Sequence, residues 1–470
     1  MTAIGAVFAA AFVLTLILRP AWLIVVVSLA IPFQNTAMVV LGPNSVTVFW
    51  GGVLVVCVRL AWLLTRPAPR RVTTPFAALF AVVLGLFVVY CVAITAIGPS
   101  VFHGMSVYVP RFGIDDQVVV QGTLAYGVSM IAQVGYLLLA VALVAYVMFE
   151  PEIPRSALVW GLVVGLAAAL IRQAVGPAWP SELLENMPNI FYSVYEERAR
   201  GTFAEPSGLA AFLAAGFAYF TGAAALSRGW ARAINLVGVF TALVVYAFAR
   251  AGTALAGIAG ALLVGAMIVV VRLCSGPVRL PRWARPASVV GALVLVASSP
   301  AIYLFSVGLV REKSDSMSAI SRAAADRHAL QVFLDTHGVG VGLGGNRPSS
   351  LAMLLLSTVG VPGTVLFVLA AVIAAVGASR DPANLPYVLT LVAVLSAGLS
   401  SKPDLSEPML WTVLALCARA GADADARRLQ ASGRRWSRPA DGVTRRAVYA
   451  TSRTITRPRS TRGVQQRWAR

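Results

Sequence analysis

Arg200 stands beside an apolar segment, where a guanidinium could bind an anion. It lies in the stretch EERARGTFAEPSG, just before an apolar run that Pro206 is expected to open as a helix. Free N–H groups at a helix N-terminus favour anions, and a guanidinium adds bidentate recognition of phosphate. The alternative is that Arg198 and Arg200 are ordinary arginines at a membrane interface.

Arg250 is a second arginine of this kind. It lies in the apolar stretch YAFARAGTALAG, and no acidic residue lies within ten positions of it. A charge at the centre of a membrane helix costs at least about 2.5–3.5 kcal/mol, so an isolated arginine there indicates a functional site. The alternative is a helix break that lets the side chain reach the interface.

A charged segment between residues 311 and 363 supplies most of the other candidates. Three of its arginines could complete an anion site: Arg322, Arg327 and Arg347. The candidates for a general base are His328, His337 and Glu205, with Asp326 and Asp335 as alternatives. Glu205 could instead pair with Arg200. We expect no metal site, because the spacing of His328, Asp335 and His337 does not suit one helix face.

Residues 317–335 of this segment are predicted to form an amphipathic helix on the outer membrane surface. Its apolar positions would be Ile320, Ala324, Leu330 and Phe333. The run HGVGVGLGGN follows and predicts a tight turn, whose backbone N–H groups could approach a phosphate.

Membrane helices must position these side chains. Of 470 residues, 58% are hydrophobic and 12% are charged, and the mean hydropathy is +0.79. Apolar runs of about twenty residues recur without the alternation of barrel strands, so they predict an all-α polytopic bundle. We expect twelve or thirteen spans, with residues 1–40 forming two short spans or one span and a re-entrant piece. The predicted spans are 3–18, 21–40, 46–64, 75–98, 122–149, 156–176, 206–227, 233–249, 252–272, 286–309, 351–378, 385–400 and 406–418.

Basic residues in alternate connections predict the orientation. The clusters at 65–71, 227–232 and 272–285 mark the cytoplasmic side, which leaves the segment 310–350 outside. The bundle is expected to occupy residues 1–420. Residues 421–470 contain thirteen arginines against three aspartates, a net charge of +10, and predict a disordered cytoplasmic tail held by anionic lipids. Nothing in the tail favours nucleic-acid binding.

Four blocks in this order resemble the O-antigen ligase and polymerase superfamily of bacterial membrane proteins. They are RARGTFAEPSGLAAFL, ARAGTALAG, SRAAADRHALQVFLDTHGVGVGLGGN and SSLAMLLLSTVGVPGTVLF. The family's second block, Ser-Arg-Gly, keeps only its arginine, Arg250. The first and third blocks match the family at Arg200, Gly201, Thr202, Phe203, Pro206 and Ser207, and at His337, Gly340, Gly342 and Gly344.

The last block departs from the family at one position. The ligase branch has a histidine and a polar residue, nine residues, a glycine, three residues and a small residue or tyrosine. This chain places Ser349 and Ser350 in the first two positions, then Gly360 and Thr364. A serine has no basicity near neutral pH, so the role of the family's histidine cannot pass to Ser349. Polymerisation is therefore favoured over ligation.

The resemblance implies an inverting, metal-independent glycosyltransferase without a cofactor, a multi-pass protein of the bacterial inner membrane. Arg200 and Arg250 would hold the departing diphosphate of an undecaprenyl-linked donor, with Arg322, Arg327 or Arg347 as a third contributor. The implied partners are a lipid-linked oligosaccharide donor, a glycan acceptor and a chain-length regulator.

Three alternatives stay open at this point. A transporter or flippase of the same lipid would also use arginines, but should show internal repeats or broken helices at matching positions. A different glycosyltransferase could use Asp115 and Asp116 in the stretch GIDDQ as a metal or base site. The chain could also be a non-catalytic member of a glycan-assembly complex.

Overall fold

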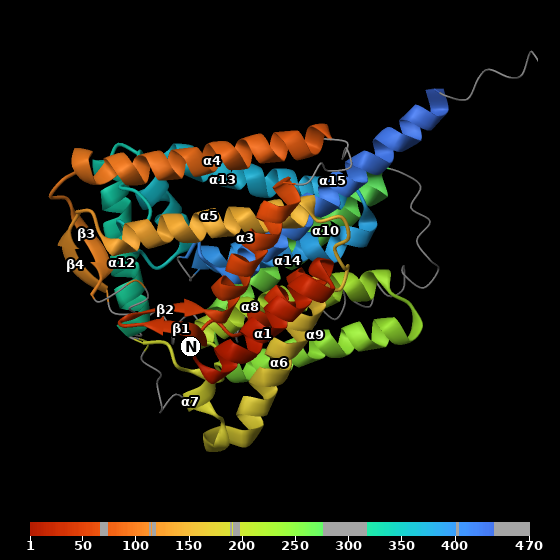
Figure 1. Ribbon diagram of the computed structural model, residues 1–470, viewed down its shortest axis with the longest axis horizontal. Coiled ribbons are helices and arrows are strands. Elements are labelled where there is room, and N and C mark those ends of the chain that lie inside the picture. The colour runs from red at the N-terminus through yellow and green to blue at the C-terminus, as the bar shows by residue number, and fades with distance from the viewer. Residues whose placement is uncertain are drawn as a thin grey trace, which may run out of the picture. The chain divides into compact units, whose positions relative to one another are not determined.

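The fold is described by a computed structural model that covers residues 1–65, 74–111, 114, 119–188, 190, 198–275, 317–400 and 404–436. These residues contain fourteen α-helices and two short β-hairpins (Figure 1). Residues 1–425 form one compact unit. The predicted span at 286–309 and the acidic pair Asp115 and Asp116 lie outside the described residues.

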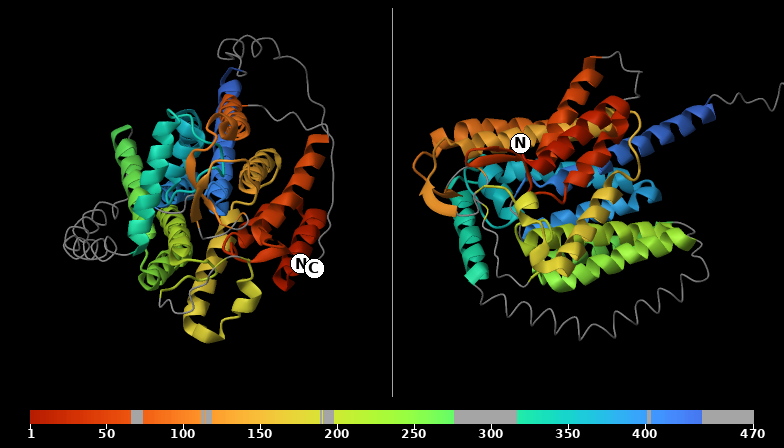
Figure 2. Two further views of the ribbon diagram at one scale, coloured as in Figure 1. Left: turned by 90° about the vertical axis from the view of Figure 1, so that its left-hand side faces the viewer. Right: turned by 60° about the horizontal axis from the view of Figure 1, so that its bottom comes forward.

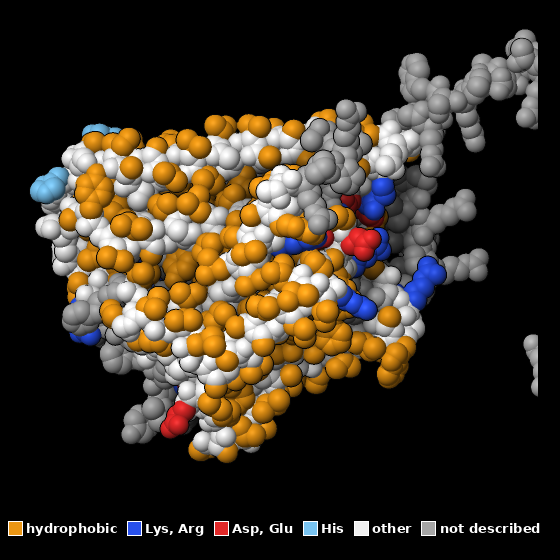
Figure 3. All heavy atoms as spheres, viewed as in Figure 1, with side chains coloured by type: hydrophobic (Ala, Val, Ile, Leu, Met, Phe, Trp, Pro, Cys, Tyr) orange, Lys and Arg blue, Asp and Glu red, His pale blue; other side chains and the backbone are white. Residues whose placement is uncertain are grey.

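Eight of the described helical segments are long and apolar enough to cross a membrane. Figure 3 shows hydrophobic side chains spread over the face that the long helices present. Exposed apolar side chains of this extent indicate contact with lipid rather than water. The eight segments are α3 (Val48–Thr65), α4 (Pro75–Val101), α5 (Val128–Phe149), α6 (Ala157–Val175) with η2 (Gly176–Ala178), α8 (Pro206–Leu226), α9 (Gly229–Ala249), α13 (Leu351–Ser379), and η3 (Pro382–Asn384) with α14 (Leu385–Ser400).

Other apolar helices accompany these eight segments. The first, α1 (Ala3–Leu18), has the predicted bounds, and α10 (Gly252–Ser275) begins at the predicted residue. Residues 21–40 do not form one spanning helix. They contain the end of η1 (Pro20–Trp22), α2 (Leu23–Ala30) and most of β1 (Ala37–Leu41), which pairs with β2 (Asn44–Thr47). The eight residues of α2 span only about 12 Å, and six of them are buried, as in a re-entrant piece.

Residues 99–121, predicted to be a loop, contain most of a second hairpin, β3 (Ser106–Pro110) and β4 (Val119–Thr123). The helix α12 (Met317–Asp335) covers this hairpin and runs across the ends of the long helices (Figures 1 and 2). Its predicted apolar positions are not the ones that pack against the hairpin. Ile320 and Leu330 are exposed, whereas Val332 packs with Val107 and Leu124 of the hairpin segment.

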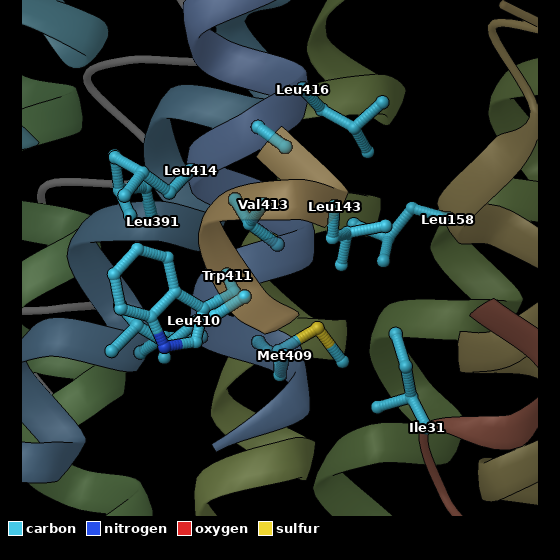
Figure 4. Packing of buried hydrophobic residues seen from close by; sticks show 14 of the residues in the cluster. Ile31, Leu143, Leu158, Leu391, Met409, Leu410, Trp411, Val413, Leu414 and Leu416 are labelled. Carbon is cyan, nitrogen blue, oxygen red and sulfur yellow. The ribbon is translucent and has the colours of Figure 1, made fainter. Parts of the chain in front are cut away.

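The first turns of α15 (Pro408–Trp436) lie in the centre of the bundle. Trp411 is fully buried, and its ring lies 6.5 Å from that of Phe367 on α13. Figure 4 shows the same turns packed against Leu143 of α5 and Leu391 of α14. The helix continues to Trp436, so the boundary predicted at residue 421 falls within a helix. Residues 437–470 of the predicted tail lie outside the described residues.

A break in α13 receives the glycine-rich loop. Gly360 has φ 62° and ψ −165°, which are not helical values, so the helix is interrupted at this residue. The N–H of Val361 donates to Gly338 O (2.8 Å), and the carbonyl oxygens of Ser357 and Thr358 accept from Val341 and Gly342 (3.0 and 2.8 Å). The loop thus satisfies backbone groups that the break releases.

Candidate functional site

Arg200 belongs to a buried cluster with Arg172 and Glu185. Arg172 lies in the last turn of α6, and Glu185 directly follows α7 (Ser181–Leu184). Arg200 Nη2 donates to Glu185 Oε2 over 2.8 Å, and Arg172 Nη1 contacts Glu185 Oε1. The exposed fractions of the side chains are 18% for Arg172, 3% for Glu185 and 8% for Arg200. The predicted anion-binding arginine is therefore held against a carboxylate, largely away from solvent.

The residues that follow Arg200 are tied to the N-terminal part of the chain. Gly201 has φ 56°, a left-handed conformation that favours glycine. The Thr202 hydroxyl donates to Pro32 O, and the Asn35 amide donates to Thr202 O (3.2 Å). Pro206 then opens α8 as predicted.

One backbone hydrogen bond joins this block to Arg250. The N–H of Ala199 donates to Phe248 O over 3.0 Å, which sets the chain beside Arg200 against the end of α9. Arg250 caps α9 with φ 46° and ψ 40°, and its side chain is exposed. The structure thus brings the two principal predicted arginines to the same end of the bundle, one buried and one accessible.

Glu205 pairs with Arg322, not with Arg200. Its Oε2 accepts from Ser207 Oγ (2.9 Å) and lies 3.9 Å from Arg322 Nη2 on α12. The side chains of Glu205 and Arg322 are 54% and 41% exposed, so this ion pair contributes only about 0–1 kcal/mol to stability. The contact matters for position, because it brings α12 to the N-terminus of α8.

Ser349, at the position of the family's histidine, is bound to α12. Its N–H donates to Asp326 Oδ1 over 2.7 Å, and its hydroxyl donates to Arg322 O over 3.3 Å. Ser350 begins α13 by accepting from the N–H of Met353 (3.4 Å). The Asp326 carboxylate of α12 is thus bound to the backbone of Ser349.

The two predicted catalytic histidines lie in different surroundings. His328 Nε2 is 3.1 Å from Ser106 O, and its ring packs edge-on against Tyr108 at 4.7 Å, so it holds α12 to the hairpin. His337 is exposed at the end of α12, with φ 50°. Arg327 is exposed on α12 as well.

The glycine-rich loop serves packing rather than phosphate binding. The N–H groups of Gly340, Val341, Gly342, Leu343 and Gly345 all donate to protein oxygens. A Cβ on Gly342 would lie 2.7 Å from Thr95 Cα, and one on Gly344 would lie 2.7 Å from Ser129 O. The glycines thus let the loop approach α4 and α5 closely. The expectation that these N–H groups bind a phosphate is wrong, because they already donate to protein oxygens.

Two clefts flank the start of α13. One, of about 400 Å³, is lined by Arg347, Asn346 and Asp404, among others. The Arg347 guanidinium also donates to Ile114 O over 3.2 Å. The other, of about 370 Å³, lies between Phe212 of α8 and Leu351 of α13, and is also lined by Asp404 and Glu407.

Four charged residues of this end were missed by sequence reasoning. Arg172 ends an apolar run, and Glu185 lies in a predicted external connection. Nothing in the sequence indicates that these two side chains contact each other. Asp404 and Glu407 precede α15, whose burial brings them to the clefts, and Gln34 donates to Glu407 over 2.6 Å. Only the tertiary fold brings these groups together.

No family model matches the chain, and no curated protein sequence matches it.

Proposed function

We propose that this chain polymerises or transfers a lipid-diphosphate-linked oligosaccharide on the outer face of a bacterial cytoplasmic membrane, in cell-surface polysaccharide synthesis. The donor is a polyprenyl-diphosphate-linked glycan, the acceptor is a glycan hydroxyl, and a separate protein sets chain length. The basic clusters at 65–71, 227–232 and 272–285 then mark the cytoplasmic side, together with the C-terminus.

The observation that carries the proposal is the meeting of four sequence blocks at one end of the bundle. The Ala199–Phe248 hydrogen bond joins the Arg200 block to the Arg250 block. The Arg322–Glu205 pair and the Ser349–Asp326 hydrogen bond join both α8 and α13 to α12. Blocks that are far apart in the chain thus meet at one end of the bundle, where a cleft is lined by Asp404 and Glu407.

The chemistry fits this charge distribution. The acceptor hydroxyl attacks the anomeric carbon, the bond from that carbon to the phosphate oxygen breaks with inversion, and the diphosphate leaves with the bonding electron pair. Fixed guanidinium groups stabilise the developing charge without a divalent ion. Arg250 and Arg322 are accessible to the diphosphate, and Arg200 supports them from the buried cluster.

The acceptor proton needs a base, and Asp326 is the best placed carboxylate. It contacts Ser349 at the frame position of the family's histidine, and it lies on the same helix as Arg322. A carboxylate in this position can take the proton as the new glycosidic bond forms.

A transporter of the same lipid is less well supported. Its ion or substrate site would be expected at broken helices with free backbone groups. The break in α13 is occupied by the glycine-rich loop, which donates to Ser357 O and Thr358 O.

Reconstitution tests the proposal. The purified full chain in proteoliposomes is given a polyprenyl-diphosphate-linked oligosaccharide, and glycan length and lipid crossing are measured separately. The proposal expects longer glycans and release of polyprenyl diphosphate. Lipid crossing without elongation would establish transport instead.

A further inference from the structure

Glu185 is shared between two arginines, and neither Glu185 nor Arg172 belongs to the sequence blocks discussed above. One carboxylate oxygen accepts from Arg200 Nη2 at 2.8 Å, and the other contacts Arg172 Nη1. One negative charge thus faces two positive charges among these three side chains. The Glu185 side chain is 3% exposed, so water screens these charges poorly.

The same contacts fix the backbone around Arg200. Arg172 Nη1 also donates to Gly201 O, and its guanidinium carbon lies 5.6 Å from the centre of the Trp179 ring, within the range of a cation–π contact. Arg172 itself sits on the rigid last turn of α6. The backbone of Gly201 is thereby attached to a membrane helix through one side chain.

This attachment extends to Arg250. Ala199 is two residues before Gly201, and its N–H bonds to Phe248 O, two residues before Arg250. The sequence of contacts runs from α6 through Arg172 and Glu185 to the Arg200 block, and from there to the end of α9. A displacement of the Arg200 block would therefore shift the accessible guanidinium of Arg250.

We infer that Arg172 and Glu185 are positioning residues of the diphosphate site. Glu185 offsets the repulsion between two buried guanidinium groups and fixes their directions. Arg172 holds Gly201, and with it the segment that orients Arg250. This inference rests on the proposed function. It predicts that both residues affect the binding of the donor but not the binding of the acceptor.

The test uses Glu185→Gln, which keeps the size of the side chain and removes its charge. We expect the KM for the lipid-linked donor to rise about tenfold to a hundredfold, as for a small displacement of binding groups. Inhibition by inorganic diphosphate should weaken in the same proportion, and the KM for the acceptor should stay unchanged. Glu185→Asp should recover part of the loss. Glu182→Gln, on the exposed face of α7, is the matched control.

Two outcomes would overturn the inference. A lower donor KM in Glu185→Gln would mean that Glu185 competes with the diphosphate for Arg200. Unchanged donor and diphosphate affinities would mean that the cluster serves folding alone. If Glu185→Gln does not accumulate, Arg172→Gln decides, because an amide removes the charge and the Nη1 group that contacts both Glu185 and Gly201. It should raise the donor KM similarly, and an unchanged KM would contradict the inference.

The two proposals fail differently. A wild-type protein that elongates no glycan contradicts the proposed function. An active wild-type protein whose Glu185 and Arg172 variants bind donor normally contradicts only the positioning role.

Discussion

The N–H of Ser349 donates to Oδ1 of Asp326 over 2.7 Å, and this bond links the start of α13 to the middle of α12. A serine occupies the frame position of the histidine found in the ligases that the chain resembles, and an acidic side chain lies against it. The proton acceptor of this chain would then come from α12 instead of from the start of α13. For Asp326 to act in place of that histidine, α12 and the start of α13 must stay in contact.

Asp326→Asn tests the base directly. Asparagine still offers an oxygen to Ser349, so α12 should stay in place, but it cannot accept a proton. We expect kcat to fall by about 10²–10⁴, with little change in donor KM. Elongation is measured with purified lipid-linked oligosaccharide. The control is Glu152→Gln, because Glu152 is exposed and lies just after the last residue of α5. A rate within a factor of two of wild type would exclude Asp326 as the base.

Arg250→Gly separates charge from backbone strain. Arg250 has φ 46°, so glycine removes the guanidinium and also relieves a left-handed conformation. We expect transfer to fall at least about a hundredfold while the thermal unfolding temperature is unchanged or raised. The control is Arg228→Ala at the start of α9, where full activity is expected. An active Arg250→Gly protein would remove this arginine from the diphosphate site.

Gly360→Ala tests whether the break in α13 holds the loop. A Cβ at this position would lie 2.2 Å from Gly338 O, and the φ of 62° disfavours alanine. We expect the free energy of unfolding to fall by more than about 2 kcal/mol, measured as a loss of thermal stability in detergent. Gly85→Ala, in open space on α4, should change it by no more than about 1 kcal/mol. Equal stabilities of the two variants would show that the break tolerates a side chain.

Arg59→Met tests the ion pair at the other end of the bundle. Arg59 Nε and Nη2 donate to the two oxygens of Glu150 at 2.9 and 3.1 Å, and both side chains are nearly buried. Removing one partner leaves a buried charge, so we expect a loss of about 3–5 kcal/mol in stability. The double variant Arg59→Met, Glu150→Gln should recover most of it. Activity per folded molecule should not change, and a specific loss of activity would connect this pair to the site.

Chelation should leave transfer intact. The proposal uses guanidinium groups in place of a divalent cation, so excess EDTA is expected to change the elongation rate by less than about twofold. Restoration of a lost activity by Mg²⁺ or Mn²⁺ would instead favour a metal-dependent transferase, with Asp115 and Asp116 as the first residues to substitute.

The sequence predicted those elements whose signals are local. A uniform apolar run predicted the bounds of α1, and apolar positions spaced among charges predicted those of α12. Pro206 marked the start of α8, and the isolated Arg250 marked the end of α9. Each of these depends on hydropathy, proline geometry or an isolated charge within one window.

The remaining features depend on contacts between distant segments. Residues 21–40 are apolar enough for a span, but Asn35 and Thr36 bond to the chain near residues 184 and 202, which draws the backbone out of a helix. The buried face of α12 is set by the hairpin beneath it, which hydropathy along α12 does not record. Arg172 and Glu185 meet only when α6 and α7 have folded.

The glycine-rich loop also has a mechanical consequence. The N–H groups of Val341 and Gly342 donate to α13 at its break, and Val361 donates back to Gly338 O, so detaching the loop would leave these donors and acceptors without partners in an apolar environment. We therefore expect α12 and α13 to move together as one unit. If the chain transfers a glycan as proposed, the widening that admits it would come from the opposite wall, where α8 and α9 meet the chain around Arg200.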